Sequence, residues 1–121
     1  MLKLFGDDRV IFISDTMEAV GMADGEYELG GLPVKKEGNR ATLFDGTIAG
    51  SATNLMDCMR TAVREMQIPL ETAVKCAAVN PARSIGIFDS YGSIENGKLA
   101  NLVVLDDALE IKKIFNRGKL I

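Results

Sequence analysis

The stretch that decides the fold is VIFISDTMEAVGMADGEYELGG, residues 10–31. It begins with four apolar residues in succession and then reaches Ser14 and Asp15. A continuous apolar run without alternation is typical of a strand covered on both faces, as in a parallel sheet. Catalytic groups collect at the carboxyl ends of strands in α/β barrels and open sheets, so Asp15 is a candidate catalytic carboxylate. The alternative is that Asp15 caps a turn, a common role for Asp at strand ends.

Behind this expected strand, the sequence changes to short strand-like pieces separated by turn residues. We expect strands within residues 27–29, 32–35 and 40–44, which form a small antiparallel excursion of hairpins. Pro33 indicates that its strand lies at a sheet edge or begins there. The next residues, 45–51 (DGTIAGS), are small and are expected to form a loop that leads into a helix.

Two helices are predicted after this loop. Asn54 is expected to cap the first, with apolar residues recurring at helical spacing behind it. Pro69 suits the first position of the second helix, and Asn80-Pro81 is expected to end it. One further turn should then close at Gly86.

The remaining sequence alternates with a period of two and predicts strands and hairpins, the last turning at residues 116–118. We place a boundary near residues 87–92. Residues 1–88 would belong to an α/β domain, and residues 89–121 would contribute strands to a small β domain. One parallel-type strand followed by two helices cannot enclose a core, because such units need neighbouring strands. The sequence therefore indicates part of a larger α/β fold, or a chain that must associate.

The composition restricts the chemistry. The 121 residues include no histidine, which excludes a complete Ser-His-Asp hydrolase or a histidine-ligated metal enzyme within this chain. A net charge of −3 gives no electrostatic case for nucleic acid or an anionic membrane. Cys58 and Cys76 carry no recognisable motif, so we expect reduced, buried thiols in a cytoplasmic protein. Arg60 and Arg64, one helical turn apart, are expected on a solvated face rather than in a phosphate clamp.

Four segments together resemble one known family. They are VIFISDTMEAVGMADGEYELGG, LFDGTIAGSATNLMDCMR, AAVNPARSIGI and GSIENGKLANLVVLD. They are similar to the C-terminal part of the N-acetylglucosamine-6-phosphate deacetylase family, in the amidohydrolase superfamily, from about residue 9 to residue 121. The most specific elements are the strand-end Asp of ISDTMEAVGM and the DGTIAGS loop. Asn101 stands where many amidohydrolases have Asp, a change that we expect to be structural.

The resemblance implies a fold and a reaction. The fold is a (β/α)8 barrel with a small β-sandwich domain; residues 10–14 would be its last barrel strand. The reaction removes acetate from N-acetylglucosamine 6-phosphate, with a divalent metal (zinc or iron) that activates water. In the family, the Asp matching Asp15 takes the proton from that water and gives it to the leaving nitrogen. Ile48, Ala49 and Gly50 match the loop that lines the sugar; the plainer alternative is a loop that only enters the helix.

The family's metal ligands, a Glu and two His, have no counterpart here, nor do its phosphate-binding groups. We therefore expect no metal to be held by this chain alone, which is expected to be inactive by itself. The expected partners are a sugar-phosphate substrate in the complete enzyme and either a second copy or the missing N-terminal part. No nucleic-acid or membrane partner is expected. Two alternatives remain open: a non-catalytic, oligomerising structural unit, or part of an amidohydrolase for another amide or cyclic amide.

Overall fold

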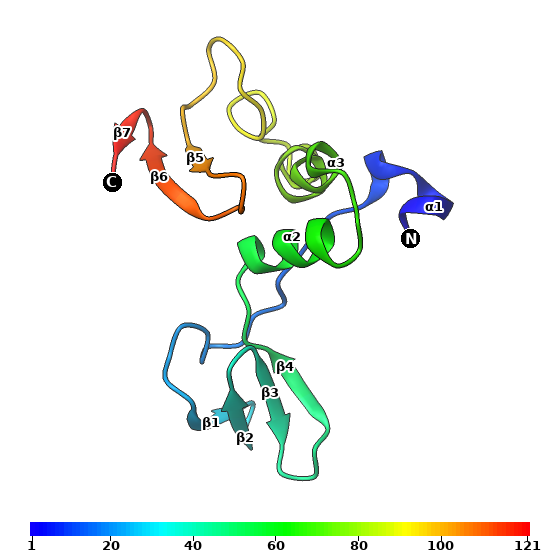
Figure 1. The fold of residues 1–121 in the computed structure, drawn as a ribbon, viewed down its shortest axis with the longest axis vertical. Coiled ribbons are helices and arrows are strands. Elements are labelled where there is room, and N and C mark those ends of the chain that lie inside the picture. The colour runs from blue at the N-terminus through cyan, green and yellow to red at the C-terminus, as the bar shows by residue number, and fades with distance from the viewer. The chain divides into compact units, whose positions relative to one another are not determined.

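The computed structural model describes all 121 residues, which form two compact units. One unit comprises Met1–Ile11 and Ala62–Ile121, and the other comprises Phe12–Thr61. The first contains most of the helices and a three-stranded sheet, and the second contains a four-stranded sheet (Figure 1). The boundary predicted between residues 88 and 89 concerns the fold that the resemblance implies, and it stays a prediction.

The four-stranded sheet of the unit Phe12–Thr61 is an antiparallel meander. Its strands lie in the order β1-β2-β3-β4. They are β1 (Gly25–Leu29), β2 (Leu32–Glu37), β3 (Arg40–Leu43) and β4 (Ile48–Ser51). The predicted hairpins within residues 27–44 are therefore confirmed. Pro33 is the second residue of β2, a strand paired on both sides, so its position near the strand start explains its presence.

The fourth strand corrects the prediction of a loop over residues 45–51. Gly46 (φ 88°) and the bond from the Thr47 N–H to Asp45 Oδ1 (2.9 Å) turn the chain back after β3. Ile48–Ser51 then pairs with β3, with a bulge in the register. The sequence IAGS has a low β-propensity, but the hairpin geometry and the exposed hydrogen-bonding groups of β3 outweigh it.

The core of this unit is small. Met17 and Ala19 are buried with Val34 and Ala41, and Tyr27, Leu29, Leu43 and Ala49 pack against them. The segment after Asp15 therefore covers one face of the sheet. A backbone hydrogen bond from the Met17 N–H to the Ser51 O (2.9 Å) fixes it there.

Residues 10–14, predicted as a barrel strand, form no strand in this chain. Their nearest β-type pairing is a single parallel bridge between Thr16 and Ser51. A strand needs a partner along its length, and no other segment of these 121 residues pairs with this run. Ile13 consequently remains 71% exposed, although its neighbours in the sequence are those of a buried strand.

The helices confirm part of the prediction. Helix α2 (Leu55–Arg64) begins after Asn54, whose Oδ1 accepts the N–H of Asp57 at 2.9 Å, so the predicted cap is confirmed. Helix α3 (Leu70–Val74) begins one residue later than predicted, with Pro69 as its N-cap.

Asn80-Pro81 does not end this helix, contrary to the prediction. The chain continues through a π turn, η2 (Lys75–Val79), into α4 (Asn80–Ser84). A π turn widens the helix, which makes room for the Pro81 ring just beyond it. The helix ends where Gly86 (φ 73°) donates its N–H to Arg83 O and Ile87 donates to Ala82 O, a Schellman motif that confirms the predicted stop.

The strands predicted for the C-terminal part are confirmed within residues 102–121, whereas residues 92–101 form no strand. The strands are β5 (Leu102–Leu105), β6 (Ile111–Asn116) and β7 (Lys119–Leu120), which form one antiparallel sheet. The last hairpin turns at residues 116–118 as predicted, with Arg117 (φ 49°) and Gly118 (φ 78°) in the left-handed conformation of a type I′ turn.

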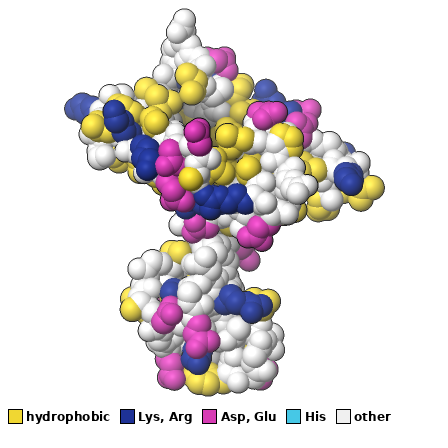
Figure 2. Space-filling view, in the orientation of Figure 1, with side chains coloured by type: hydrophobic (Ala, Val, Ile, Leu, Met, Phe, Trp, Pro, Cys, Tyr) yellow, Lys and Arg dark blue, Asp and Glu magenta, His cyan; other side chains and the backbone are white.

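The unit containing these strands leaves many large apolar side chains in solvent (Figure 2). They include Leu70, Val74, Ile85, Val103, Val104, Ile111 and Ile114. Val103 and Val104 are consecutive residues of β5, so apolar side chains are exposed on both faces of this strand. Exposed apolar side chains in such number are typical of a chain that another polypeptide covers.

Asn80 and Lys75 attach the N-terminal segment to the continuous helix formed by α3, η2 and α4. Two short helical turns, α1 (Leu2–Phe5) and η1 (Asp7–Arg9), open the chain. The Asn80 Nδ2 donates to Asp7 O and Val10 O, both at 2.7 Å. Lys75 Nζ lies 3.1 Å from Asp7 Oδ1 and 2.7 Å from Asp8 Oδ1. The hydrogen bond and charge of Lys75 lower the pKa of Asp8, and those of Asp8 and Asp7 raise the pKa of Lys75.

Asn80→Ala should destabilise the chain by about 1–3 kcal/mol, because it leaves two backbone carbonyls without their donor. The free energy of unfolding in urea measures the loss. The matched control is Asn96→Ala, an exposed position, which should change it by less than about 0.5 kcal/mol. Equal values for the two variants would contradict the attachment.

A second attachment lies within the four-stranded sheet. Lys36, with a side chain only 6% exposed, lies 3.0 Å from Asp24 Oδ1. Asp24 Oδ1 also accepts the N–H of Gly38 at 2.9 Å. The hydrogen bond from Lys36, followed by that from Gly38, lowers the pKa of Asp24. Because the folded pKa lies below the unfolded value of about 3.9, the stabilisation is complete above that value and is lost as the pH falls through the folded pKa.

Asp24→Asn should therefore lower the urea midpoint at pH 7, and the difference from the wild type should shrink as the pH falls below the ordinary Asp pKa and the wild-type carboxyl takes up its proton. Urea unfolding across pH 2–7 gives both values. Asp107→Asn, an exposed carboxylate without a partner in the structure, is the control and should track the wild type. A pH-independent effect of Asp24→Asn would show that charge is not the cause.

Candidate functional site

Asp15 lies at a backbone conformation that few residues adopt. Its φ is 47°, in the left-handed region, and its side chain is exposed. Asp tolerates this region better than most residues but still adopts it at a cost. The conformation kinks the chain between the apolar run and the segment that covers the sheet.

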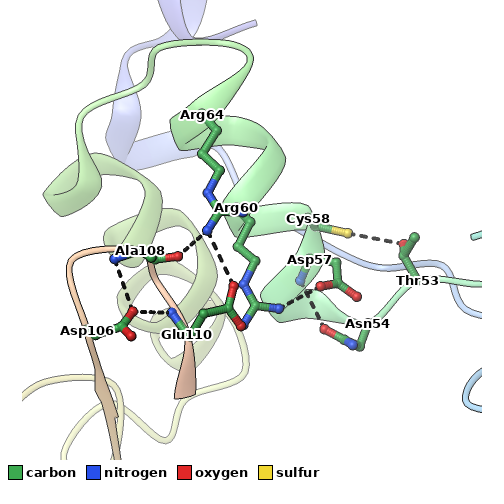
Figure 3. A network of polar contacts seen from close by, with 9 residues as sticks. All are labelled: Thr53, Asn54, Asp57, Cys58, Arg60, Arg64, Asp106, Ala108 and Glu110. Atoms are coloured by element: carbon green, nitrogen blue, oxygen red, sulfur yellow. Dashed lines mark hydrogen bonds and ion pairs between the residues drawn. The ribbon is translucent and has the colours of Figure 1, made fainter. Parts of the chain in front are cut away.

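The carboxylate of Asp15 makes no hydrogen bond or ion pair in the structure, which argues against the turn-capping alternative. A capping Asp accepts a nearby backbone N–H. Asp106 does so: its Oδ1 accepts the N–H groups of Ala108 (3.0 Å) and Glu110 (2.8 Å), as Figure 3 shows. The Lys112 ammonium and these N–H groups lower the pKa of Asp106. Asp15 has no such role and its oxygens stay available.

The structure connects the residues after Asp15 to the end of β4. Thr16 bridges Ser51, and the Thr16 hydroxyl donates to Thr53 O at 2.5 Å. Together with the Met17–Ser51 bond, these contacts bring the Asp15 segment to the carboxyl end of the strand that contains the predicted sugar loop.

The three predicted loop residues occupy different environments on β4. Gly50 pairs with Ala41, and a Cβ built on Gly50 would lie 3.6 Å from Met17 Cβ, so this glycine lies beside the Asp15 segment. Ala49 packs against the sheet core. Ile48 is 67% exposed at the start of the strand, about 10 Å from Ser51 at the usual rise of a strand.

Sequence reasoning missed a group of hydroxyl side chains around these residues. Ser51 Oγ and Thr53 Oγ1 share a hydrogen bond of 2.8 Å, and the Thr53 N–H donates to Ser51 Oγ at 3.2 Å. Thr53 Oγ1 also lies 3.7 Å from Cys58 Sγ in the first turns of α2 (Figure 3). Small hydroxyl residues that immediately follow a strand are the signal that could have indicated such a network.

The two arginines of α2 are engaged in ion pairs. Arg60 Nη1 lies 2.8 Å from Asp57 Oδ1. Arg64 Nη2 donates to Ala108 O and lies 3.4 Å from Glu110 Oε1 (Figure 3). Both guanidinium groups therefore serve the fold rather than a phosphate clamp, and the Arg60 side chain is more buried (19% exposed) than the predicted solvated face implied.

The chain does not contain a donor set for a metal ion. No three of its Cys, Asp and Glu side chains lie close enough together to coordinate one. A metal of the kind that the resemblance implies does not fit these residues. None of the helices is long and apolar enough to cross a bilayer.

Comparison with known proteins identifies the family. Residues 32–121 match the amidohydrolase family model. A putative N-acetylgalactosamine-6-phosphate deacetylase of Escherichia coli K12 is 34% identical over 93% of this chain and 68% of its own length. The N-acetylglucosamine-6-phosphate deacetylase of Vibrio furnissii is 34% identical over 93% of this chain and 28% of its own length.

Solved structures agree. The crystal structure of the Pasteurella multocida N-acetylglucosamine-6-phosphate deacetylase superposes on 99% of this chain with a TM-score of 0.92 at 27% identity. A Mycobacterium smegmatis enzyme of the same name, in complex with N-acetyl-D-glucosamine-6-phosphate, gives a TM-score of 0.87 at 35% identity over 98% of this chain. The chain covers 31% and 32% of these two structures. It thus spans about a third of most of its relatives, and it belongs to the amidohydrolase family.

Proposed function

We propose that this chain is the C-terminal part of a deacetylase that hydrolyses N-acetylglucosamine 6-phosphate to glucosamine 6-phosphate and acetate. The observation that carries the proposal is the agreement of nearly the whole chain with deacetylases of that name, at a TM-score of up to 0.92. The 35% identity to an enzyme whose structure contains N-acetyl-D-glucosamine-6-phosphate supports the same substrate.

A second candidate substrate is N-acetylgalactosamine 6-phosphate. Two relatives named for it, from Escherichia coli K12 and O157:H7, are each 34% identical to this chain over 113 residues. The two sugars differ only in the configuration of one hydroxyl group, so the same amide chemistry serves both.

In this proposal Asp15 moves the proton. The oxygen of water attacks the carbonyl carbon of the acetamide while the Asp15 carboxylate accepts the proton of that water. The C–N bond then breaks, and Asp15 returns the proton to the leaving nitrogen, so that acetate and the free amine are released. An exposed carboxylate with no hydrogen bond or ion pair of its own suits this role.

Residues Ile48, Ala49 and Gly50 line the sugar in this proposal. Gly50 lies beside the Asp15 segment, where Met17 and Leu29 occupy the space that a side chain would take, so it would contribute its backbone rather than a side chain. Ile48 would contribute its exposed side chain further along the strand.

The rest of the site would come from outside these residues. Amidohydrolases are generally metal-dependent, and the donors for a metal and for the phosphate would lie on the remaining part of the barrel. Residues 10–14 would then pair with barrel strands, and residues 89–121 would join the β-sandwich domain. The exposed Ile13 and the apolar surface of Figure 2 support such an association. The alternative is a non-catalytic unit that covers the same surface by binding a second copy.

Asp15→Asn in the complete enzyme that carries this chain should lower kcat by about 10²- to 10⁴-fold with little change in KM, since the amide cannot shuttle a proton. Release of acetate from each of the two sugar phosphates is the measurement, and the preferred sugar identifies the substrate. Asp107→Asn is the matched control. Turnover of Asp15→Asn within a few-fold of the wild type would rule out the proton shuttle.

The isolated chain should elute from size-exclusion chromatography above its 13.1 kDa mass, because its apolar surface is open to a second copy. Val103→Lys, which alters one of these exposed apolar side chains (53% exposed), should shift it toward the monomer. Ile94→Lys, which alters an isoleucine that is 87% exposed in a loop, is the control and should leave the elution unchanged. A sharp wild-type monomer peak would refute the idea that this surface associates.

A further inference from the structure

We propose that Thr16 is a positioning residue, whose hydroxyl holds Asp15 in the left-handed conformation by bonding to Thr53 O. The catalytic consequence rests on the proposed role of Asp15. The conformational claim depends only on the contacts of residues 16–17 with residues 51–53.

The chain is attached at two successive residues directly after Asp15. Met17 is buried in the sheet core (6% exposed), and its N–H donates to Ser51 O. Thr16 adds the parallel bridge to Ser51 and the 2.5 Å hydrogen bond from its hydroxyl to Thr53 O. Core packing fixes the position of Met17. The Thr16 hydroxyl is therefore the contact that sets the orientation of the two peptide groups between Asp15 and Met17.

Thr suits this position because it is β-branched. Its χ1 is stiff, so the direction of the hydroxyl also defines the local backbone. The left-handed conformation of Asp15 costs energy and persists only where surrounding contacts impose it. In contrast, the carboxylate of Asp15 makes no contact that would hold it.

The acceptor is itself held in place. The N–H of Thr53 donates to Ser51 Oγ, and Thr53 Oγ1 contacts both Ser51 Oγ (2.8 Å) and Cys58 Sγ (3.7 Å). The loop between β4 and α2 is therefore tied to the strand before it and to the helix after it. Thr16 thereby holds Asp15 at a fixed position relative to Gly50.

A fixed position of Asp15 matters because a proton shuttle must reach both the water oxygen and the leaving nitrogen at hydrogen-bond distance. A displacement of about 1 Å, caused by a residue that does not touch the substrate, can cost about 10²-fold in rate. Loss of the Thr16 hydroxyl should therefore lower kcat while leaving KM almost unchanged.

The conformational test uses NMR of this chain. A strong intraresidue NOE between the amide proton and Hα marks a positive φ. We expect it for Asp15 in the wild type and in Thr16→Ser, and we expect it to weaken in Thr16→Val and Thr16→Ala, which lack the hydroxyl. Gln67 (φ 54°) and Arg117 (φ 49°) are internal controls that should keep the strong NOE in every variant. Unchanged NOE contacts of Met17 with Val34 and Ala41 report that the unit containing Asp15 is folded. A strong Asp15 NOE in either variant without the hydroxyl overturns the proposal.

The catalytic test uses the complete enzyme and acetate release. Thr16→Val should lower kcat by about 10- to 100-fold with KM within about 2-fold, whereas Thr16→Ser should restore kcat to within about 3-fold. Equal kcat values for Thr16→Val and the wild type overturn the catalytic half. A wild-type enzyme that releases no acetate refutes the proposed function instead, and the NMR result still decides the conformational claim.

Discussion

The bond from the Met17 N–H to Ser51 O closes the smaller unit on itself. It holds Met17 and Ala19 over the sheet, where they bury Val34 and Ala41. A meander of four short strands is marginal without a covered apolar face. The same bond sets the chain direction at residue 17, so the kink at Asp15 has to absorb the difference from the extended run before it. The core of the unit thus depends on this contact, and the adjacent Thr16–Thr53 hydrogen bond is the one that we propose holds the candidate catalytic residue.

Local signals in the sequence were enough for much of the fold. The hairpins follow from paired glycines and an Asn-containing turn, the start of α2 from Asn54, and the end of α4 from Gly86. Each of these features is decided within about six residues. The strand Ile48–Ser51 was not predictable in the same way, because its residues gain their conformation from pairing with β3.

The apolar run at residues 10–14 shows the opposite case. Its composition is that of a buried strand, but burial and pairing are properties of neighbours that these 121 residues do not supply. In the candidate site, the sequence alone singled out Asp15, directly after the apolar run, and the motifs around it. The left-handed backbone and the Thr16–Thr53 hydrogen bond were not, since the bond joins residues 37 positions apart. The proposed substrate class rests on the relatives and on the resemblance of DGTIAGS, and no spacing within the chain could have supplied it.

The π turn Lys75–Val79 has a consequence for the evolution of this helix. A π turn is equivalent to one residue inserted into an α-helix, and each helical residue advances the face by about 100°. The extra residue rotates Asn80 onto the side that bonds Asp7 and Val10. Deleting any one residue of the turn would restore a regular helix but carry Asn80 away from both carbonyls. A change in the length of this turn would therefore displace Asn80, whereas a substitution that keeps its length would not.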